Sequence, residues 1–240
     1  MLQNLTFTGI DNFTELDGLL ALSKDYPNIE FGVLTCSDWQ DKGMRYPDPI
    51  LMNHLGHKEL QFALHICGRD TKDVLNGNWD NIIARFGDSF QFFQRIQLNL
   101  GRQKVKLRYS LTNVPDNVKE IIVQQSDIKA LDMYKYLKGT SLANTFRVTT
   151  LVDGSGGRGV SCSPSEDLFA CMDGKFGFAG GINPRNCRDI YESCEQFSEI
   201  LKLPYWLDME SGVRTDDNYF SINACRKVCE EVFEHERRTL

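Results

Sequence analysis

Two stretches decide the fold of this chain: Phe178-Ala-Gly-Gly-Ile-Asn-Pro184 and Leu207-Asp-Met-Glu-Ser-Gly-Val213. Each begins as a short apolar run, ends in small residues, and is followed by a segment with helical spacing. Two such units in succession place backbone amides at neighbouring strand ends and helix starts. Unpaired amides and the helix dipole both favour an anion there. The two stretches therefore predict a phosphate site of the kind that the last two strand–helix loops of an eightfold α/β barrel often supply.

Eight short runs with strand character alternate with helical patterns along the chain. The expected strands are Leu5–Thr8, Glu30–Leu34, Leu60–Ile66, Arg95–Asn99, Glu120–Gln124, Arg147–Val152, Phe176–Ala179 and Tyr205–Asp208. Several are nearly continuous apolar runs, as expected of parallel strands covered by helices. The alternation predicts one α/β domain over residues 1–240, a (β/α)8 TIM barrel with eight parallel strands. An open doubly wound sheet is the alternative, but no Gly-x-Gly-x-x-Gly follows the first strand.

Four helices are expected where apolar residues recur at helical spacing: Phe13–Ser23, Asp127–Leu137, Asn186–Leu201 and Ser221–Glu236. Asp11 and Asn12 form the expected cap signal of the first helix, and Ser221 is a good N-cap for the last. The segment Gly101–Asp116 alternates basic and apolar residues. This pattern fits either a helix or an extended edge.

The composition is that of an ordinary globular protein, and 240 residues can bury a large core without metals or disulfides. The formal net charge of -6 argues against general attraction to nucleic acid or to an anionic membrane surface. We expect no membrane span and no secretory signal, and hence a cytoplasmic protein with reduced thiols. The eight cysteines contain no Cys-x-x-Cys pair. We therefore expect mostly small buried residues, with no metal site and no cofactor.

Three motifs follow one another in order, each at an expected strand end: Leu151-Val-Asp-Gly-Ser-Gly-Gly-Arg-Gly159, Gly180-Gly-Ile-Asn-Pro184 and Asp208-Met-Glu-Ser-Gly-Val213. In these motifs the sequence resembles phosphoribosylanthranilate isomerase, the barrel enzyme of tryptophan biosynthesis. Arg45-Tyr46 after the second strand and Ile96-Gln-Leu98 in the fourth are weaker matches. Two positions depart from the family. Thr8 stands where the family has its catalytic cysteine, and Arg214 stands where it usually has glutamate.

The resemblance implies an Amadori rearrangement of an aminoribose phosphate. An acid must open the sugar ring, and a base must then remove a proton from the sugar carbon next to the imine. Asp153 matches the family's acid, a role that needs a pKa raised by burial. Thr8 is a poor replacement for a thiolate, because an unassisted hydroxyl is not ionised near neutrality. We therefore expect weak or absent isomerisation unless another group serves as base; Cys36, Cys67 and Glu210 are the candidates.

The same resemblance assigns the ligand phosphate to the amides of four residues: Gly180, Gly181, Ser211 and Gly212. Arg45 would hold an anionic or planar group at the other end of the ligand, although it also fits a solvated loop charge. Asp208 and Gln97 would contact the ligand, or else serve as structural hydrogen-bonding groups of the barrel. The glycines and serine could also be turn residues alone.

Three functions fit these residues. The first is an isomerase acting on a phosphorylated sugar-type ligand. The second is a barrel that binds a phosphate ligand without catalysis, as a sensor or partner protein. The third is a lyase or epimerase on the same scaffold, since a fold does not dictate its chemistry. In each case we expect a phosphorylated small-molecule ligand, no nucleic-acid or membrane partner, and a monomer or homodimer.

Overall fold

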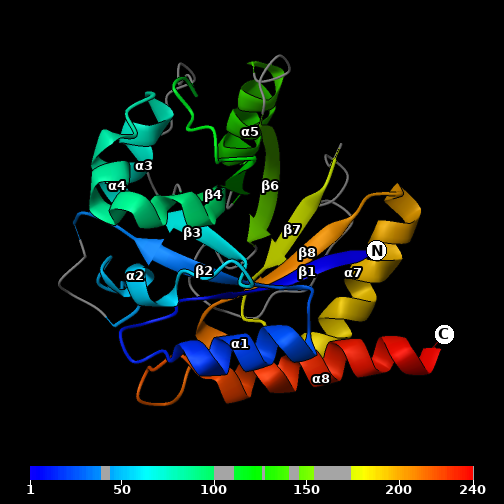
Figure 1. The fold of residues 1–240 in the computed structure, drawn as a ribbon. Helices are drawn as coiled ribbons and strands as arrows, with labels where there is room; N and C mark the ends of the chain where they lie inside the picture. Colours follow the sequence, from blue (N-terminus) through cyan, green and yellow to red (C-terminus); the bar gives the residue numbers. More distant parts are fainter. Residues whose placement is uncertain (39–43, 100–110, 126–127, 141–145, 154–173, 240) are drawn as a thin grey trace.

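The computed structural model of the chain describes residues 1–38, 44–99, 111–125, 128–140, 146–153 and 174–239. Eight parallel strands close into one barrel in sequence order, and helices surround it (Figure 1). The strands are β1 Leu2–Thr8, β2 Ile29–Thr35, β3 Phe62–Ile66, β4 Phe93–Leu98, β5 Glu120–Gln125, β6 Arg147–Asp153, β7 Phe176–Ala179 and β8 Tyr205–Met209. The predicted (β/α)8 barrel is confirmed, and each expected strand is present with ends that differ by a few residues.

The helices are α1 Leu16–Asp25, α2 Leu51–Leu55, α3 Gly68–Leu75, α4 Asp80–Phe86, α5 Ile128–Thr140, α7 Cys187–Leu201 and α8 Ile222–Thr239, with 3-10 turns η1 Gly87–Phe92 and η2 Ser211–Val213. The four expected helices are present. Helices α2, α3 and α4 were not predicted, because they are short and α3 buries the polar residues Asp70 and Thr71. Of the ambiguous segment Gly101–Asp116, residues 101–110 lie outside the described part, and residues 111–116 form turns and irregular chain.

Helix α1 begins three residues later than predicted, and its capping differs. Its N-cap is Glu15, whose side chain makes no capping hydrogen bond within the described part of the chain. Asp11 was expected to cap α1 and does not. Its carboxylate instead accepts a hydrogen bond from the amide of Phe13 at 3.1 Å and closes a tight turn ahead of the helix. At the other end of the chain the prediction is confirmed, because Ser221 Oγ accepts from the amide of Ala224 in the first turn of α8 at 3.2 Å.

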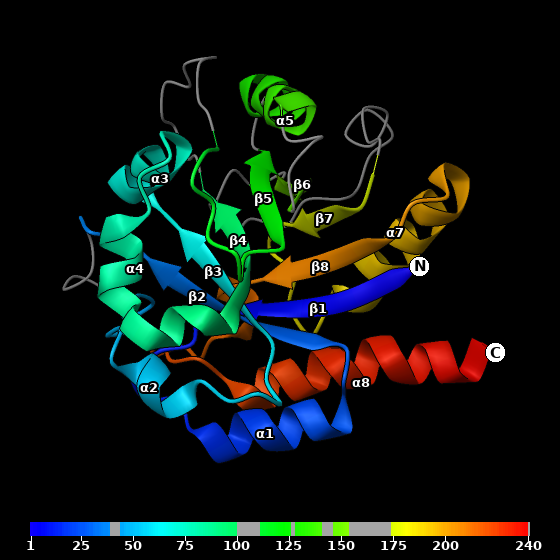
Figure 2. The same cartoon turned by 45° about the horizontal axis from the view of Figure 1, so that its top comes forward.

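The first and last helices lie side by side (Figure 2). Tyr26, just after α1, stacks on Phe233 of α8 with ring centroids 5.8 Å apart. Arg226 of α8 pairs with Asp25 of α1 at 2.7 Å. The helices therefore cover the seam where β8 meets β1. No helix in the described ranges is long and apolar enough to cross a membrane.

The barrel wall is packed on both faces. Leu5 and Phe7 of β1 belong to the large apolar core between strands and helices, whereas Thr6 and Thr8 alternate with them and point inward. The middle of the barrel holds a separate apolar cluster of Ile122, Leu151 and Trp206. Gly177 makes room for this cluster: a Cβ there would lie 2.2 Å from the Trp206 ring and 2.6 Å from Leu151.

A layer of charged side chains lies toward the N-terminal ends of the strands. Arg95 pairs with Glu30 at 2.5 Å and with Glu120 at 3.1 Å, and Lys175 pairs with Glu120 at 3.2 Å. The Arg95 guanidinium also lies over the Trp206 ring at 4.6 Å. Buried charges persist when they are paired in this way. Because charged and apolar groups fill the lower and middle barrel, the polar groups open to a ligand lie at the C-terminal ends of the strands.

We predict that Gly177→Ala lowers the free energy of unfolding by about 1–3 kcal/mol, because the added methyl group overpacks the Trp206 ring. Urea unfolding would measure the change. Gly139→Ala in α5 is the matched control, since a Cβ there meets nothing within 4 Å among the described residues. The control should be neutral or slightly more stable. An equal effect of the two substitutions would contradict the packing described for the barrel centre.

Candidate active site

Two carboxylates lie side by side at the C-terminal rim of the barrel. Asp153 ends β6 and is in register with Ala179 of β7, which is in register with Asp208 of β8. Residues in register point to the same face of a sheet, and strands lie about 4.8 Å apart, so the two Cα atoms are about 10 Å apart. Both aspartates are at most 5% exposed. Ala179, which lies between them, has a small side chain.

Thr8 and Asp208 form a buried pair. The Thr8 hydroxyl donates to Asp208 Oδ1 at 2.7 Å. Gly32 on β2 leaves room for Thr8, because a Cβ there would lie 2.3 Å from the hydroxyl oxygen. Burial raises the pKa of Asp208 to about 7; the Thr8 hydrogen bond and Arg95 oppose this shift, while Glu210 and Glu30 add to it. Asp208 is therefore close to half-protonated near neutral pH.

Asp153 is held by a side-chain amide. Gln124 of β5 donates from Nε2 to Asp153 Oδ2 at 2.8 Å. Asp153 is 4% exposed, at the end of its strand, as expected for a rim residue. The glycine-rich loop that follows it, residues 154–159, lies outside the described part of the chain.

Gln97 belongs to a chain of polar side chains inside the barrel. Its amide nitrogen lies 3.2 Å from His65 Nδ1 and donates to Asn99 Oδ1 at 2.9 Å. Burial lowers the pKa of His65 to about 3, with Arg95 adding to the shift, so the ring is neutral. Within the described residues, His65 Nε2 and Gln97 Oε1 have no hydrogen-bond partner.

Two cysteines lie near this rim, Cys36 buried and Cys67 partly buried. Asn99 Nδ2 lies 3.2 Å from Cys67 Sγ, and Cys36 is fully buried at the end of β2. Burial raises the pKa of Cys67 to about 12, against the opposing hydrogen bonds from Asn99 and Tyr46. Cys67 is therefore protonated near neutrality and does not supply a thiolate base. The other described cysteines, Cys187, Cys194, Cys225 and Cys229, are also buried.

The two small-residue loops that follow β7 and β8 are in direct contact. A Cβ on Gly212 would lie 1.9 Å from the carbonyl oxygen of Ile182 and 2.7 Å from Asn183 Cβ, so only glycine permits this approach. Gly180 and Gly181 have φ angles of 124° and 64°, a region that favours glycine. Among the described residues, the amides of Gly181, Ser211 and Gly212 donate to no acceptor. The loops thus bring unpaired donors together beside the aspartates.

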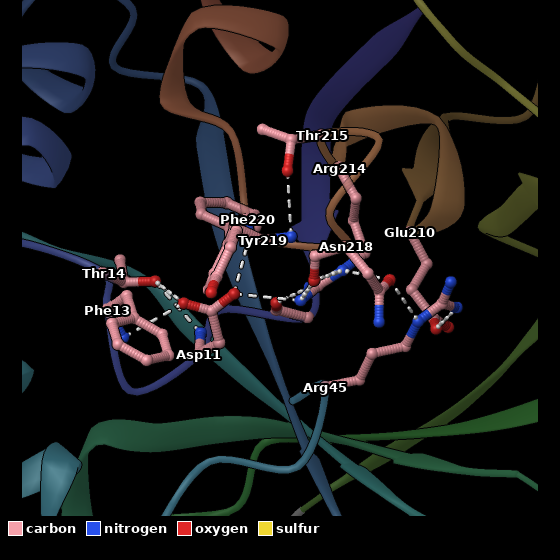
Figure 3. A network of polar contacts seen from close by, with 11 residues as sticks. Asp11, Phe13, Thr14, Arg45, Glu210, Arg214, Thr215, Asn218, Tyr219 and Phe220 are labelled. Atoms are coloured by element: carbon pink, nitrogen blue, oxygen red, sulfur yellow. Dashed lines mark hydrogen bonds and ion pairs between the residues drawn. The ribbon is translucent and has the colours of Figure 1, made fainter. Parts of the chain in front are cut away.

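Arg45 reaches from the loop after β2 to the loop after β8. Its Nη1 lies 2.6 Å from Glu210 Oε1, and its Nε donates to Asn218 Oδ1 at 3.2 Å (Figure 3). Nη1 also donates to Ser211 Oγ at 3.2 Å. The Arg45 side chain is 34% exposed. Its guanidinium therefore lies beside the loop that carries Ser211, and so at the edge of the expected phosphate site.

A second arginine in this region is structural. Arg214 pairs with Asp11 at 2.9 Å, and both side chains are 2% exposed. Arg214 also donates to the carbonyls of Gly9 and Asn218, while Asp11 Oδ2 accepts from the amide of Phe220 at 2.6 Å (Figure 3). This network ties the loop after β1 to the loop after β8. It accounts both for arginine at position 214 and for the failure of Asp11 to cap α1.

Sequence reasoning did not identify two features of this rim. It treated Asp11 as a helix cap, although its partner lies 203 residues away. It also placed Asp208 among ligand contacts without its hydrogen bond to Thr8, which joins residues 200 positions apart. A local pattern carries no signal for such pairs. The one available hint was that Thr8 and Asp208 both lie at predicted strand ends.

We predict that Asp208→Asn stabilises the protein above neutral pH. The pKa of Asp208 rises from 3.8 to about 7 on folding. The wild-type stability is therefore fully present below about pH 4 and is lost as pH rises through about 7, by up to about 4 kcal/mol. Asparagine does not ionise and avoids this loss. Urea unfolding of both proteins at pH 4 and pH 8 would measure the change.

The matched control for this prediction is Asp132→Asn, on the exposed face of α5. The difference in the free energy of unfolding between Asp132→Asn and the wild type should be the same at pH 4 and at pH 8. If Asp208→Asn also differs from the wild type by the same free energy at both pH values, the pKa of Asp208 is not raised by folding.

Solved structures of phosphoribosylanthranilate isomerases have the same fold as this chain. The enzyme from Thermus thermophilus is 16% identical with a TM-score of 0.57, over 97% of this chain and 99% of that one. TrpF from Jonesia denitrificans is 12% identical with a TM-score of 0.58, over 98% of each chain. A third, in complex with reduced 1-(O-carboxyphenylamino)-1-deoxyribulose 5-phosphate, is 13% identical with a TM-score of 0.55, over 98% of this chain and 100% of that one.

No protein-family model matches the chain, and the comparison with curated protein sequences finds no match. At identities this low, structural similarity establishes the fold alone. The chain therefore has a (β/α)8 barrel like that of phosphoribosylanthranilate isomerase.

Proposed function

We propose that this protein is an isomerase that binds a phosphorylated sugar-type ligand at the C-terminal mouth of its barrel. The reaction is an aldose–ketose rearrangement of the Amadori type, as in tryptophan biosynthesis. The observation that carries the proposal is the direct contact of the Gly212 loop with the Ile182 loop, beside two buried aspartates. The fold adds support, since one phosphoribosylanthranilate isomerase with this fold holds a deoxyribulose 5-phosphate compound.

The ligand phosphate binds to the backbone amides of Gly180, Gly181, Ser211 and Gly212. Three of these, all except Gly180, have no acceptor within the described residues, and two of the three, Ser211 and Gly212, begin the turn η2. Arg45 contributes a positive charge at the Ser211 edge. This local cation matters because the chain as a whole carries a net charge of -6.

Asp153 is the acid that protonates the ring oxygen of the sugar and opens the ring. Its buried position and its hydrogen bond from Gln124 hold the carboxyl group in one orientation. Asp208 and Gln97 lie at the same end of the barrel, where they contact the rest of the ligand. Thr8 occupies the place of the family's catalytic cysteine and contributes a hydroxyl group to this surface.

A second function is favoured by one observation, the threonine at position 8. A barrel that has lost the thiolate base would bind the phosphosugar without converting it, and would act as a sensor or partner protein. Both functions use the same phosphate site. They differ in whether the bound ligand is converted to product.

The first test is rescue of a tryptophan auxotroph that lacks the isomerase. We expect the wild-type chain to rescue growth and Asp153→Asn to abolish rescue, because removal of a general acid lowers kcat by about 10²–10⁴-fold. Assays of the purified proteins with phosphoribosylanthranilate should likewise show turnover by the wild type and little or none by Asp153→Asn. Asp132→Asn, on the exposed face of α5, should rescue like the wild type. Ligand binding without rescue or turnover would reject the isomerase and favour the second function.

The second test concerns the phosphate site. We expect Gly181→Asp to weaken binding of ribose 5-phosphate at least tenfold, because the new side chain crowds the loop and its charge repels the phosphate. Isothermal titration calorimetry would measure the Kd. Gly139→Asp adds the same charge on α5, away from the mouth, and should leave the Kd unchanged. Equal dissociation constants for the two variants would reject this phosphate site.

A further inference from the structure

The isomerisation proposed above needs a base, and three of the residues first considered, Thr8, Cys67 and Glu210, are poor choices for that role. Thr8 carries a hydroxyl group in place of a thiol, and this hydroxyl donates its hydrogen bond to Asp208. Cys67 is kept protonated by burial, which raises its pKa to about 12. Glu210 is 36% exposed and is paired with Arg45 at 2.6 Å. The carboxyl group of Asp208, which lies beside Thr8 at the rim, is a better candidate.

Asp208 has one oxygen held and one oxygen open. Oδ1 accepts from Thr8 at 2.7 Å. Within the described residues nothing donates to Oδ2. In a carboxylate with this arrangement one oxygen fixes the orientation, and the other is available to take a proton.

The position of Asp208 suits a base that works with Asp153. The register places the two carboxyl groups at one level of the barrel, on either side of Ala179. Asp208 also adjoins the Gly212 loop, since η2 begins two residues after β8 ends. A sugar whose phosphate binds to that loop would extend between the two aspartates. The ring oxygen and the acidic carbon would then face opposite carboxyl groups.

We infer that Asp208 is the general base that removes the proton from the sugar carbon next to the imine, and that Thr8 positions its carboxylate. The inference rests on the isomerase function proposed above. It relocates the base from strand β1, where the resemblance places it, to strand β8. Asp208 is the catalytic residue in this scheme and Thr8 is a positioning residue.

The proton transfers balance within the two aspartates. Asp153 gives its proton to the ring oxygen, the ring C–O bond breaks, and an iminium forms at carbon 1. Asp208 then takes the proton from carbon 2; the C–H electron pair forms the carbon 1–carbon 2 double bond, and the iminium π pair moves to nitrogen. Asp208 returns its proton to carbon 1, and the hydroxyl proton of carbon 2 passes to Asp153 as the ketone forms. Both aspartates regain their starting states.

The charges around Asp208 determine how the rate depends on pH. The groups that face it are Thr8 of β1, Glu30 of β2, Arg95 of β4, Asp153 of β6, and Glu210 with its partner Arg45. Burial outweighs the Thr8 hydrogen bond and the Arg95 charge, and raises the pKa of Asp208 to about 7. The base form is therefore lost as pH falls through about 7, and kcat should fall with it.

The test compares turnover of phosphoribosylanthranilate by wild-type protein and by Asp208→Asn, with Asp132→Asn as the control. We expect Asp208→Asn to lower kcat by about 10²–10⁴-fold with KM changed less than threefold, and the control to match the wild type. In D2O, deuterium should appear on carbon 1 of the product in wild-type turnovers where the proton held by Asp208 exchanges with solvent before it is returned. Urea unfolding would verify that Asp208→Asn is folded.

Two substitutions at position 8 test the positioning role. Thr8→Val removes the hydrogen bond that stabilises the Asp208 carboxylate, so the acidic limb of the kcat profile should move to higher pH. Thr8→Ser keeps the hydroxyl and should keep the wild-type profile. If Thr8 had only a packing role, Thr8→Val would leave the acidic limb of the kcat profile at the same pH.

The outcomes separate this inference from the function on which it rests. If the wild type binds ribose 5-phosphate but forms no product from phosphoribosylanthranilate, the proposed isomerase function is wrong and this inference is wrong with it. If the wild type turns over and Asp208→Asn stays within threefold of it, the isomerase stands and Asp208 is not the base. A loss of kcat in Glu210→Gln, with Asp208→Asn active, would assign the base to Glu210 and overturn the inference.

Discussion

The hydrogen-bonded pairing of β8 with β1 is the constraint on which the rest of this structure depends. It closes the sheet with Thr6 in register with Asp208, so that no strand edge remains. Because all eight strands run parallel, closure also gathers their C-terminal ends into one rim. Thr8 meets Asp208 there although the two lie 200 residues apart. The packing of α1 on α8 covers the same seam from outside.

Charged side chains lie at two levels inside the barrel. Toward the N-terminal ends of the strands, Arg95 and Lys175 neutralise Glu30 and Glu120 in a closed set of ion pairs. Above the apolar cluster around Trp206, Asp208 accepts one side-chain hydrogen bond from the described residues, that of Thr8, and burial penalises its charge. A buried carboxylate with this environment weakens the fold near neutral pH. Such groups occur where chemistry requires a pKa near the working pH, which agrees with the role inferred for Asp208.

The two loops that follow β1 and β8 are tied together by the buried pair of Asp11 and Arg214. This network holds the segment after η2 against the barrel, and Arg45 reaches the same loop from the β2 side. A binding site made of backbone amides depends on such support, because the amides have little freedom to adjust once their loops are packed. Arginine at position 214 thus has a structural reason.

The sequence by itself determined the architecture. Strand–helix alternation and the apolar runs identified all eight strands, and the helical spacing located α1, α5, α7 and α8. These features are local, because strand and helix periods repeat within a few residues. The short helices α2, α3 and α4 escaped prediction because a few turns carry too little periodicity. The small residues at 180–184 and 211–213 also identified the paired loops.

Only the tertiary structure decided which side chains meet at the rim. The bond from Thr8 to Asp208, the ion pair of Asp11 with Arg214, and the approach of Gly212 to Ile182 all join residues distant in the chain. The pKa of Asp208 also depends on burial by every strand around it. The physical reason is that local patterns report backbone conformation, whereas contacts and desolvation arise from closure of the whole barrel.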